Sequence, residues 1–274
     1  MNENHVTAYN EETGKGLVRH VLIRYGFKTG EIMVCLVLNG DNLPKSEKLV
    51  HKLVEIPGMT SITYSINKEN TNVIMGKEIR EIWGEPYITD YIGNVKYQIS
   101  PLSFYQINHD GAEVLYRTAA EFAELSEGDT LLDLYCGVGT IGLSMAHKAG
   151  KLIGVEVIPA AVENAKENAK RNGITNAEFI CADAGEAATK LAENNMKPDV
   201  VIVDPPRKGC GEDVVEAMKT LSPRRIVMVS CNSATAARDC ARLKEIGYTP
   251  VKMRAVDMFP RTGHVEAVIC LTRK

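Results

Sequence analysis

The 274-residue sequence predicts an α/β fold, in which a mostly parallel sheet follows a small β-rich α+β unit. A hydrophobic share of 45% and a charged share of 24% are those of an ordinary globular chain. From about residue 107 onward, apolar runs alternate with helical patterns, which is typical of parallel strands joined by helices. The last two strand candidates have no helix between them, which implies an antiparallel pair at one edge of the sheet.

The small unit is expected to form a first domain over residues 1–100. Its runs of alternating polarity predict strands, an amphipathic stretch closed by Pro57-Gly58 predicts one helix, and Gly93-Asn94 predicts a tight hairpin. The first ten residues have the character of a loop. The predicted strands are 17–25, 31–38, 59–67, 78–83, 87–91 and 95–100, and the predicted helix is 46–56.

The second domain is expected to span residues 101–274. It opens with a long helix over 110–125 and then repeats an apolar strand followed by an amphipathic helix. Its predicted strands are 130–135, 152–156, 177–181, 200–204, 225–230, 250–256 and 265–271. Its further predicted helices are 140–148, 159–172, 184–194, 212–221 and 234–246.

Composition argues against several classes of protein. No apolar run is long enough to cross a bilayer, and the first five residues lack the basic and apolar regions of a secretory signal. Seven cysteines without regular spacing argue against a disulfide framework and favour a reducing, cytoplasmic location. No Cys-x-x-Cys or His-x-x-x-His pair occurs, so no metal site is assigned. We expect a monomer.

A nucleotide cofactor site is predicted where the first strand of the second domain ends. Gly137 and Gly139 precede a helix that starts at Thr140, and glycines let the backbone approach a ligand at a helix N-terminus. About 20 residues later Glu156 ends the next strand, where an acidic side chain can accept both ribose hydroxyls. These features suggest either a dinucleotide or S-adenosylmethionine (SAM).

Two carboxylates favour SAM over a dinucleotide. Asp183, at the end of the third strand, is placed to accept a hydrogen bond from an adenine amine. Asp133, inside the first strand, would be a costly buried charge unless it accepts hydrogen bonds from backbone or ligand donors. The glycine pattern is also incomplete for Gly-x-Gly-x-x-Gly, and SAM, which has no phosphates, requires a less strict pattern.

The turn Asp204–Arg207 follows the fourth strand, at the edge where open α/β sheets bind substrates. Enzymes that methylate exocyclic amines of bases have a similar turn followed by an aromatic residue, whereas Arg207 and Lys208 follow here. Cytosine C5-methyltransferases often have a cysteine next to the proline of this turn. Cys210 is four residues past Pro206, and we treat it as a bystander.

Methylation of a pyrimidine carbon requires a nucleophile. Uracil C5 attacks a methyl sulfonium only after a thiolate has added to C6 and converted the ring to an enolate. Cys231 directly follows the apolar strand 226–230 and precedes a helix, whose positive N-terminus is expected to favour the thiolate and lower the pKa. The alternative, a buried structural cysteine, is our interpretation of the other six: Cys35, Cys136, Cys181, Cys210, Cys240 and Cys270.

A base must then remove the C5 proton so that the thiol can be eliminated. Glu266 begins an apolar strand, where poor solvation should raise the pKa of its carboxyl. His264 is a second candidate for the base. An ordinary charge at a strand end is the alternative interpretation of Glu266.

These motifs resemble those of the RNA uracil-5-methyltransferases, which act on bacterial 23S rRNA or on the T-loop of tRNA. The matching stretches, in family order within residues 101–274, are Ser103–Asn108, Asp133–Thr140, Asp204–Arg207, Ser230–Asn232 and His264–Glu266. The resemblance implies a Rossmann-like SAM-dependent methyltransferase sheet, with Cys231 as the nucleophile and Glu266 as the base. It further implies that SAM is contacted by Gln106, Tyr135, Thr140, Glu156, Asp183 and Asp204.

The sequence departs from this family in one respect. Many rRNA-type members carry an N-terminal oligonucleotide-binding domain and a cysteine cluster that holds iron–sulfur, and these residues contain neither. The resemblance implies the C-terminal part of such a protein, or a member without that domain, with residues 1–100 as the small RNA-facing central domain. The net charge of −3 agrees with the lack of that RNA-binding domain, because a protein that binds RNA tightly by itself usually has a basic surface.

The leading functional hypothesis is SAM-dependent methylation of C5 of a uridine in 23S rRNA, with the base swung out of its stack. Phe104 or Tyr105 would stack on the base, and Arg207 would contact the adjacent phosphate. A tRNA uracil-5-methyltransferase is the first alternative. The others are methylation of cytosine C5 or of an exocyclic amine, and a non-catalytic module for RNA binding or ribosome assembly.

Overall fold

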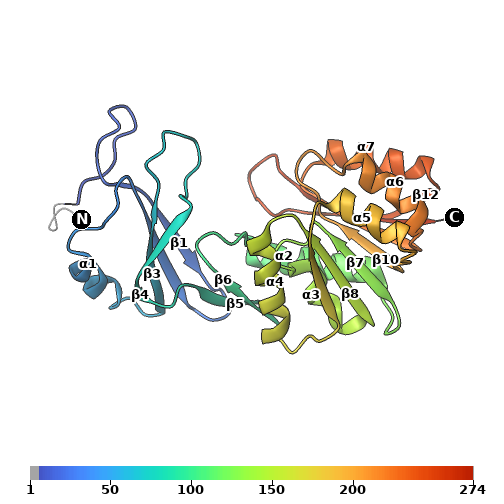
Figure 1. Ribbon diagram of the computed structural model, residues 1–274, viewed down its shortest axis with the longest axis horizontal. Helices are drawn as coiled ribbons and strands as arrows, with labels where there is room; N and C mark the ends of the chain where they lie inside the picture. The colour runs from blue at the N-terminus through green and yellow to red at the C-terminus, as the bar shows by residue number, and fades with distance from the viewer. Residues whose placement is uncertain (1–5, 274) are drawn as a thin grey trace. The chain divides into compact units, whose positions relative to one another are not determined.

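The structure is a computed structural model that describes residues 6–273 (Figure 1). The chain divides into two compact units, and each is described by itself. The first runs to Tyr91 and includes Tyr97–Tyr105, and the second consists of Ile92–Lys96 and the described residues from Gln106 onward. The loop predicted for the first ten residues lies partly outside the described residues. No helix within residues 6–273 is long and apolar enough to cross a membrane.

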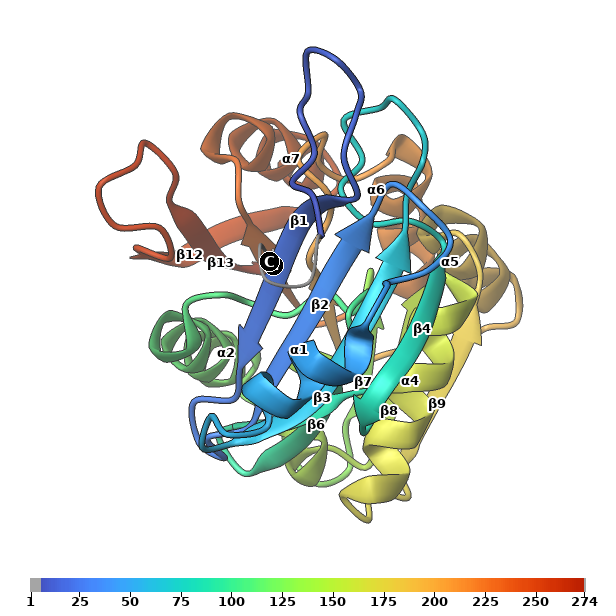
Figure 2. The same cartoon turned by 90° about the vertical axis from the view of Figure 1, so that its left-hand side faces the viewer.

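The first unit is built on a four-stranded sheet of order β1-β2-β3-β4. β1 is antiparallel to β2, β3 is antiparallel to β4, and α1 connects the parallel strands β2 and β3. Figure 2 shows α1 against one face of this sheet, where Val34, Leu36 and Leu38 of β2 form the centre of a small core. The elements are β1 (Val18–Tyr25), β2 (Ile32–Leu38), α1 (Ser46–Leu53), β3 (Met59–Ile66) and β4 (Glu78–Gly84).

The predicted hairpin at Gly93-Asn94 is present. β5 (Ile88–Ile92) and β6 (Val95–Ile99) form a two-stranded sheet, which leaves only residues 93 and 94 for the turn. Gly93 has a φ of 58°, a left-handed conformation that two-residue hairpins require and that glycine adopts at little cost.

The second unit is built on a seven-stranded sheet of order β12-β13-β11-β10-β7-β8-β9. The five strands from β11 to β9 are parallel, whereas β13 runs antiparallel to both β11 and β12. The prediction of an α/β sheet with an antiparallel edge pair is therefore confirmed. The strands are β7 (Thr130–Leu134), β8 (Lys151–Glu156), β9 (Ala177–Cys181), β10 (Val200–Val203), β11 (Arg225–Ser230), β12 (Tyr248–Val256) and β13 (Glu266–Arg273).

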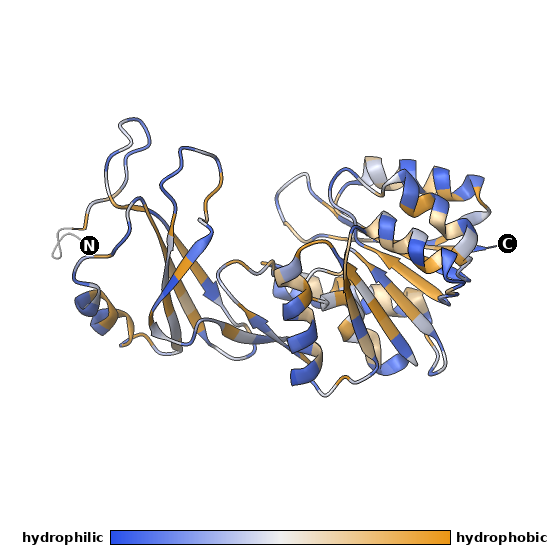
Figure 3. Cartoon of the chain, viewed as in Figure 1, coloured by the Kyte–Doolittle hydropathy of each residue, from blue (hydrophilic) through white to orange (hydrophobic). Residues whose placement is uncertain are grey.

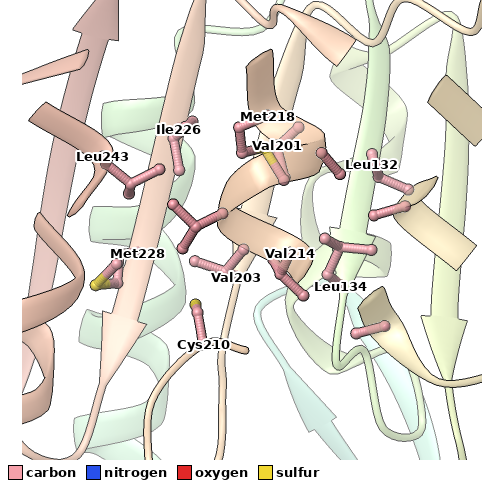
Figure 4. Close-up of a cluster of buried hydrophobic side chains, with 14 of the residues drawn as sticks. Leu132, Leu134, Val201, Val203, Cys210, Val214, Met218, Ile226, Met228 and Leu243 are labelled. Carbon is pink, nitrogen blue, oxygen red and sulfur yellow. The ribbon is translucent and has the colours of Figure 1, made fainter. Parts of the chain in front are cut away.

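Helices cover both faces of this sheet. α5, α6 and α7 pack on one face over a large apolar cluster that includes Leu134, Val203 and Met228 (Figure 4), and α2, α3 and α4 pack on the other. The central strands β10 and β11 are apolar along almost their whole length, as Figure 3 shows, because both of their sides are covered. The helices are α2 (His109–Ala123), α3 (Thr140–Met145), α4 (Pro159–Arg171), α5 (Ala184–Glu193), α6 (Glu212–Leu221) and α7 (Ser233–Glu245).

The order of the strands across the sheet changes direction at β7. The chain proceeds from β7 through β8 to β9 on one side, and then returns to β10 on the other side of β7. In open α/β sheets, ligands bind outside the carboxyl ends of the strands at such a switch point. The fold therefore directs the search for a functional site to the loops that follow β7, β8, β9 and β10.

Candidate functional site

The carboxyl ends of four adjacent strands gather most of the predicted cofactor residues. Tyr135 follows β7, Glu156 ends β8, Asp183 follows β9 and Asp204 follows β10. The registers pair Leu134 with both Val155 and Val203, so these strands end at the same edge of the sheet. The four side chains therefore come from neighbouring positions along that edge.

Glu156 is held by the backbone on both of its oxygens. Oε2 accepts a hydrogen bond from the Gly137 N–H at 3.0 Å, and Oε1 accepts one from the Ile158 N–H at 2.9 Å. A carboxylate oxygen has two acceptor positions, so each oxygen retains one for a ligand. The carboxylate is oriented in advance to accept two hydroxyl groups.

The turn after β7 has a left-handed backbone at three positions. Gly137 and Gly139 have φ values of 56° and 82°, and Tyr135 has a φ of 65°, which is strained for a residue with a side chain. The Tyr135 hydroxyl accepts a hydrogen bond from the Gly211 backbone, and burial, with the nearby Cys210 and other acidic groups, raises its pKa to about 12. The ring therefore lies toward the start of α6.

Asp183 caps α5. Its Oδ1 accepts hydrogen bonds from the N–H groups of Gly185 and Glu186 at 2.9 and 3.4 Å. Its Oδ2 makes no hydrogen bond within residues 6–273, and the side chain is exposed. One oxygen is thus committed to the helix, and the other remains available to a ligand donor.

The other two predicted cofactor residues are placed differently. Thr140 is the first residue of α3, and its Oγ1 accepts a hydrogen bond of 3.3 Å from the hydroxyl of Tyr116 on α2. Gln106 precedes α2 and is partly buried, but it forms no hydrogen bond with the other predicted cofactor residues.

The predicted nucleophile and base lie at the adjoining ends of neighbouring strands. Cys231 directly follows β11, and Glu266 begins β13, which runs antiparallel to β11. The register ends with Ser230 paired to Ala267, so each of the two residues lies one position beyond that pair, and the charge of Glu266 acts on the Cys231 thiol. Glu266 is only 6% exposed, and burial raises the pKa of its carboxyl, as its place at the start of an apolar strand predicted.

The predicted lowering of the Cys231 pKa is wrong. Burial and the negative charges of Glu266 and Asp204 raise the pKa of this thiol, and the positive charge of Arg207 opposes them only in part. The N–H groups at the start of α7 are capped by the side chain of Asn232, which accepts from Ala234 and Thr235. The sequence pattern revealed the helix N-terminus but not the two carboxylates beside the sulfur.

A buried phenol near the carboxylates was not predicted. Tyr116 is 5% exposed, and after burial the charges of Asp204, Asp133 and Glu266 contribute to raising its pKa. The same carboxylates affect one another: burial first, then the charges of Glu266 and Asp133, raise the pKa of Asp204 to about 8. Nothing in the helical pattern of α2 distinguishes this tyrosine from an ordinary core residue.

Arg207 and His264 form a pair at the surface. The guanidinium Nη2 of Arg207 lies 3.1 Å from Nδ1 of His264, and both side chains are exposed. His264 is thus engaged by Arg207. The predicted stacking residues belong to the first unit, where Phe104 is 76% exposed and the Tyr105 hydroxyl donates to Asp90.

Replacement of Asp133 by asparagine is expected to change how stability depends on pH. Asp133 is buried, and burial raises the pKa of its carboxyl to about 7, with the Gly142 N–H opposing and the charge of Glu156 adding. A raised folded-state pKa stabilises the protein at low pH, and that stability is lost as the pH rises through 7. Between pH 5 and pH 8, the free energy of unfolding of the wild type should therefore fall by about 2.5 kcal/mol relative to that of Asp133→Asn.

Urea unfolding of both proteins at the two pH values measures this difference. Glu127→Gln, at an exposed turn position, is the control and should show the same stability difference from wild type at both pH values. An Asp133→Asn difference that does not vary with pH would contradict a raised Asp133 pKa.

Three comparisons place the chain among known proteins. A family model described as tRNA (Uracil-5-)-methyltransferase matches residues 85–274. An uncharacterized RNA methyltransferase of Clostridium acetobutylicum is 46% identical over 274 residues, and one of Oceanobacillus iheyensis is 43% identical over 275. These matches cover the whole chain and 60% of each relative, so the chain spans about 60% of the length of the relatives it matches.

The solved structure of a relative matches nearly the whole chain. The tRNA (uracil-54, C5)-methyltransferase of Pyrococcus abyssi, solved in complex with S-adenosyl-L-homocysteine, is 34% identical with a TM-score of 0.86. The match covers 99% of this chain and 64% of that one. Because the family model covers well over half of the chain and close relatives cover all of it, the chain belongs to the tRNA (uracil-5-)-methyltransferase family.

Proposed function

We propose that the protein transfers the methyl group of SAM to C5 of a uridine in structured RNA, through a covalent adduct between Cys231 and C6 of the base. The observation that carries the proposal is that Cys231 and Glu266 each lie one position beyond the last pair of β11 and β13, with the Glu266 carboxyl buried and its charge acting on the Cys231 thiol. Family membership supports the same chemistry.

The residues at the carboxyl ends of β7, β8 and β9 fit SAM. Glu156 has one acceptor position left on each oxygen for the two ribose hydroxyls, and Asp183 has Oδ2 left for an adenine amine. Asp133 Oδ1 is buried without a hydrogen-bond partner, which suits a ligand that carries an ammonium group. The bound S-adenosyl-L-homocysteine of the Pyrococcus abyssi relative supports the same assignment.

The chain's own groups then account for the reaction. SAM supplies the methyl group as an electrophile. The Cys231 sulfur, after losing its proton, bonds to C6 of the uracil, and the ring electrons make C5 nucleophilic. After C5 has accepted the methyl group, Glu266 removes the C5 proton, the C5–C6 double bond re-forms and the sulfur leaves as thiolate.

The target base must leave its stack to reach this site. Base-modifying enzymes extrude the nucleotide and hold it in a pocket, and contacts to the flanking phosphates position the strand. Arg207 is exposed, and its charge acts on Cys231, so it is suited to hold a phosphate next to the target nucleotide.

The preferred substrate is 23S rRNA, on the resemblance of the sequence motifs to the rRNA-type enzymes. A tRNA substrate is the second candidate, because the Pyrococcus abyssi relative is a tRNA (uracil-54, C5)-methyltransferase. Methylation assays on 23S rRNA and tRNA transcripts, side by side, separate the two. Activity on tRNA alone would exclude the rRNA assignment.

Incubation with SAM and RNA that contains 5-fluorouridine is expected to trap the enzyme. Glu266 can remove a proton but not a fluorine from C5, so elimination of Cys231 stops after methyl transfer. A denaturing gel should show a protein–RNA adduct, and RNA with ordinary uridine should not give a stable one. A complex that dissociates on denaturation, without methyl incorporation, would instead indicate a non-catalytic RNA-binding module.

A further inference from the structure

The loop between β10 and α6, residues 204–211, is held by side chains from α7. The Arg207 carbonyl accepts hydrogen bonds from Asn232 Nδ2 at 3.2 Å and Thr235 Oγ1 at 3.3 Å. One turn further along α7, Arg238 Nη2 donates to the carbonyl of Lys208 at 2.7 Å. These side chains belong to the N-cap and the first two turns of α7, whose N-cap residue Asn232 directly follows Cys231.

The most buried of these contacts between α7 and the loop involves an ion pair between Arg238 and Asp239. Asp239 is fully buried, and its Oδ2 accepts a hydrogen bond of 2.8 Å from the Cys210 N–H. Its Oδ1 accepts from Arg238 Nε at 2.9 Å. A buried carboxylate is costly unless it is paired and hydrogen-bonded, and here each of its oxygens has a partner.

The loop and the ion pair are packed too closely for any side chain between them. Gly209 has a φ of 82°, and a Cβ added there would lie 2.3 Å from Arg238 Nη2 and 2.4 Å from Asp239 Oδ2. Only glycine fits this position without displacing the pair. The path of the loop and the position of the ion pair are therefore fixed together.

This arrangement links the two sides of the proposed active site. Cys231 immediately precedes the N-cap of α7, whereas Asp204 and Arg207 belong to the anchored loop. The charge of Asp204 raises the pKa of the Cys231 thiol, and the charge of Arg207 lowers it. A shift of the loop away from α7 would change the position of both charges relative to the sulfur.

We propose that Arg238 and Asp239 are positioning residues, which act through the loop to hold Asp204 and Arg207 at a fixed distance from Cys231. The proposal rests on the proposed function only for its effect on catalysis. Displacement of a positioned group by about 1 Å can lower a rate by about 100-fold even when the reacting groups are intact. Loss of the ion pair should therefore slow adduct formation with little change in fold or cofactor affinity.

The neighbouring arginine of α7 provides a matched control. Arg242 also approaches Asp239 Oδ1, at 3.7 Å, and pairs with Glu212 at 3.3 Å, but it donates no hydrogen bond to the loop. Arg238→Met and Arg242→Met each remove one positive charge from α7, but only Arg238→Met removes a hydrogen bond to the loop. The full 274-residue chain is used in each case.

Two measurements test the proposal. With 5-fluorouridine RNA, Arg238→Met should form the adduct about 10- to 100-fold more slowly than wild type, whereas Arg242→Met should stay within about twofold. Affinity for S-adenosyl-L-homocysteine should be equal in both variants. Arg238→Met should melt at a lower temperature than Arg242→Met, because the buried Asp239 loses its nearest partner, and Arg238→Lys should recover part of the rate. Hydrogen exchange of the Cys210 amide should become about tenfold faster in Arg238→Met alone.

Equal exchange at Cys210 in the two arginine variants would overturn the proposal, whatever the chemistry of the enzyme. Equal rates of adduct formation would overturn it as well. A parallel loss of melting temperature and cofactor affinity in Arg238→Met would assign the pair to stability alone. Absence of any adduct in wild type would count against the proposed function, and the exchange measurement would still decide the anchoring role.

Discussion

Replacement of Cys231 by alanine is expected to abolish methyl transfer to RNA. Without the sulfur, uracil C5 remains a poor nucleophile, and no other described cysteine lies at the start of α7 against Glu266. We expect a loss of at least about 10³-fold in rate, which corresponds to about 4 kcal/mol of transition-state stabilisation. The measurement is incorporation of labelled methyl groups into RNA at saturating SAM.

The same variant also tests the alternative chemistries. Methylation of an exocyclic amine needs no thiol, so activity that persists in Cys231→Ala would exclude the covalent scheme. Cys240→Ala is the matched control, because Cys240 is a partly buried cysteine of the same helix whose role we take to be structural. It should keep the wild-type rate. Both variants should bind S-adenosyl-L-homocysteine as wild type does.

The order and type of the elements follow from local patterns that the sequence displays directly. Buried parallel strands such as 200–203 are continuous apolar runs, and the helices between them are amphipathic. The antiparallel edge pair was predictable because β12 and β13 follow each other without a helix. Boundaries moved by a few residues, as where the predicted helix 140–148 ends at Met145 and continues as a short 3₁₀ turn.

The carboxyl ends of the strands could also be predicted, because parallel strands end at one edge and the polar residues that follow them meet there. The electrostatics of the site could not. Burial raises the pKa of Cys231 most, and the charges of Glu266 and Asp204 raise it further. These two residues lie 35 and 27 positions away along the chain and come near the thiol only through the pairing of strands in the sheet. The start of a helix, and thus its positive end, can be predicted from sequence, whereas the distance between two charges is set by tertiary structure.

The contacts that hold the 204–211 loop to α7 could not be predicted from the sequence for a related reason. In sequence, Arg238 and Asp239 are two charged residues in a helix, a pattern that usually indicates a solvated face. Only the fold shows that Asp239 is buried and bonded to the Cys210 backbone. Long-range hydrogen bonds from side chains to backbone leave no periodic signal.

Replacement of Glu266 by glutamine is expected to make the covalent intermediate accumulate on ordinary RNA. The amide keeps the shape of the side chain but cannot accept the C5 proton, so the reaction should stop after methyl transfer with Cys231 still bonded to C6. Turnover should fall by about 10²- to 10⁴-fold, the usual contribution of a positioned base. A denaturing gel of the variant with SAM and uridine RNA measures the adduct.

The competing assignment is that Asp204 removes the proton, because it is a second carboxyl whose charge acts on Cys231 and whose pKa is raised to about 8. Asp204→Asn therefore serves as the comparison, and Glu245→Gln, at the exposed end of α7, as the neutral control. Adduct that accumulates in Asp204→Asn but not in Glu266→Gln would transfer the role of base to Asp204. The double variant Cys231→Ala/Glu266→Gln should form no adduct, because the bond being trapped is the one between sulfur and C6.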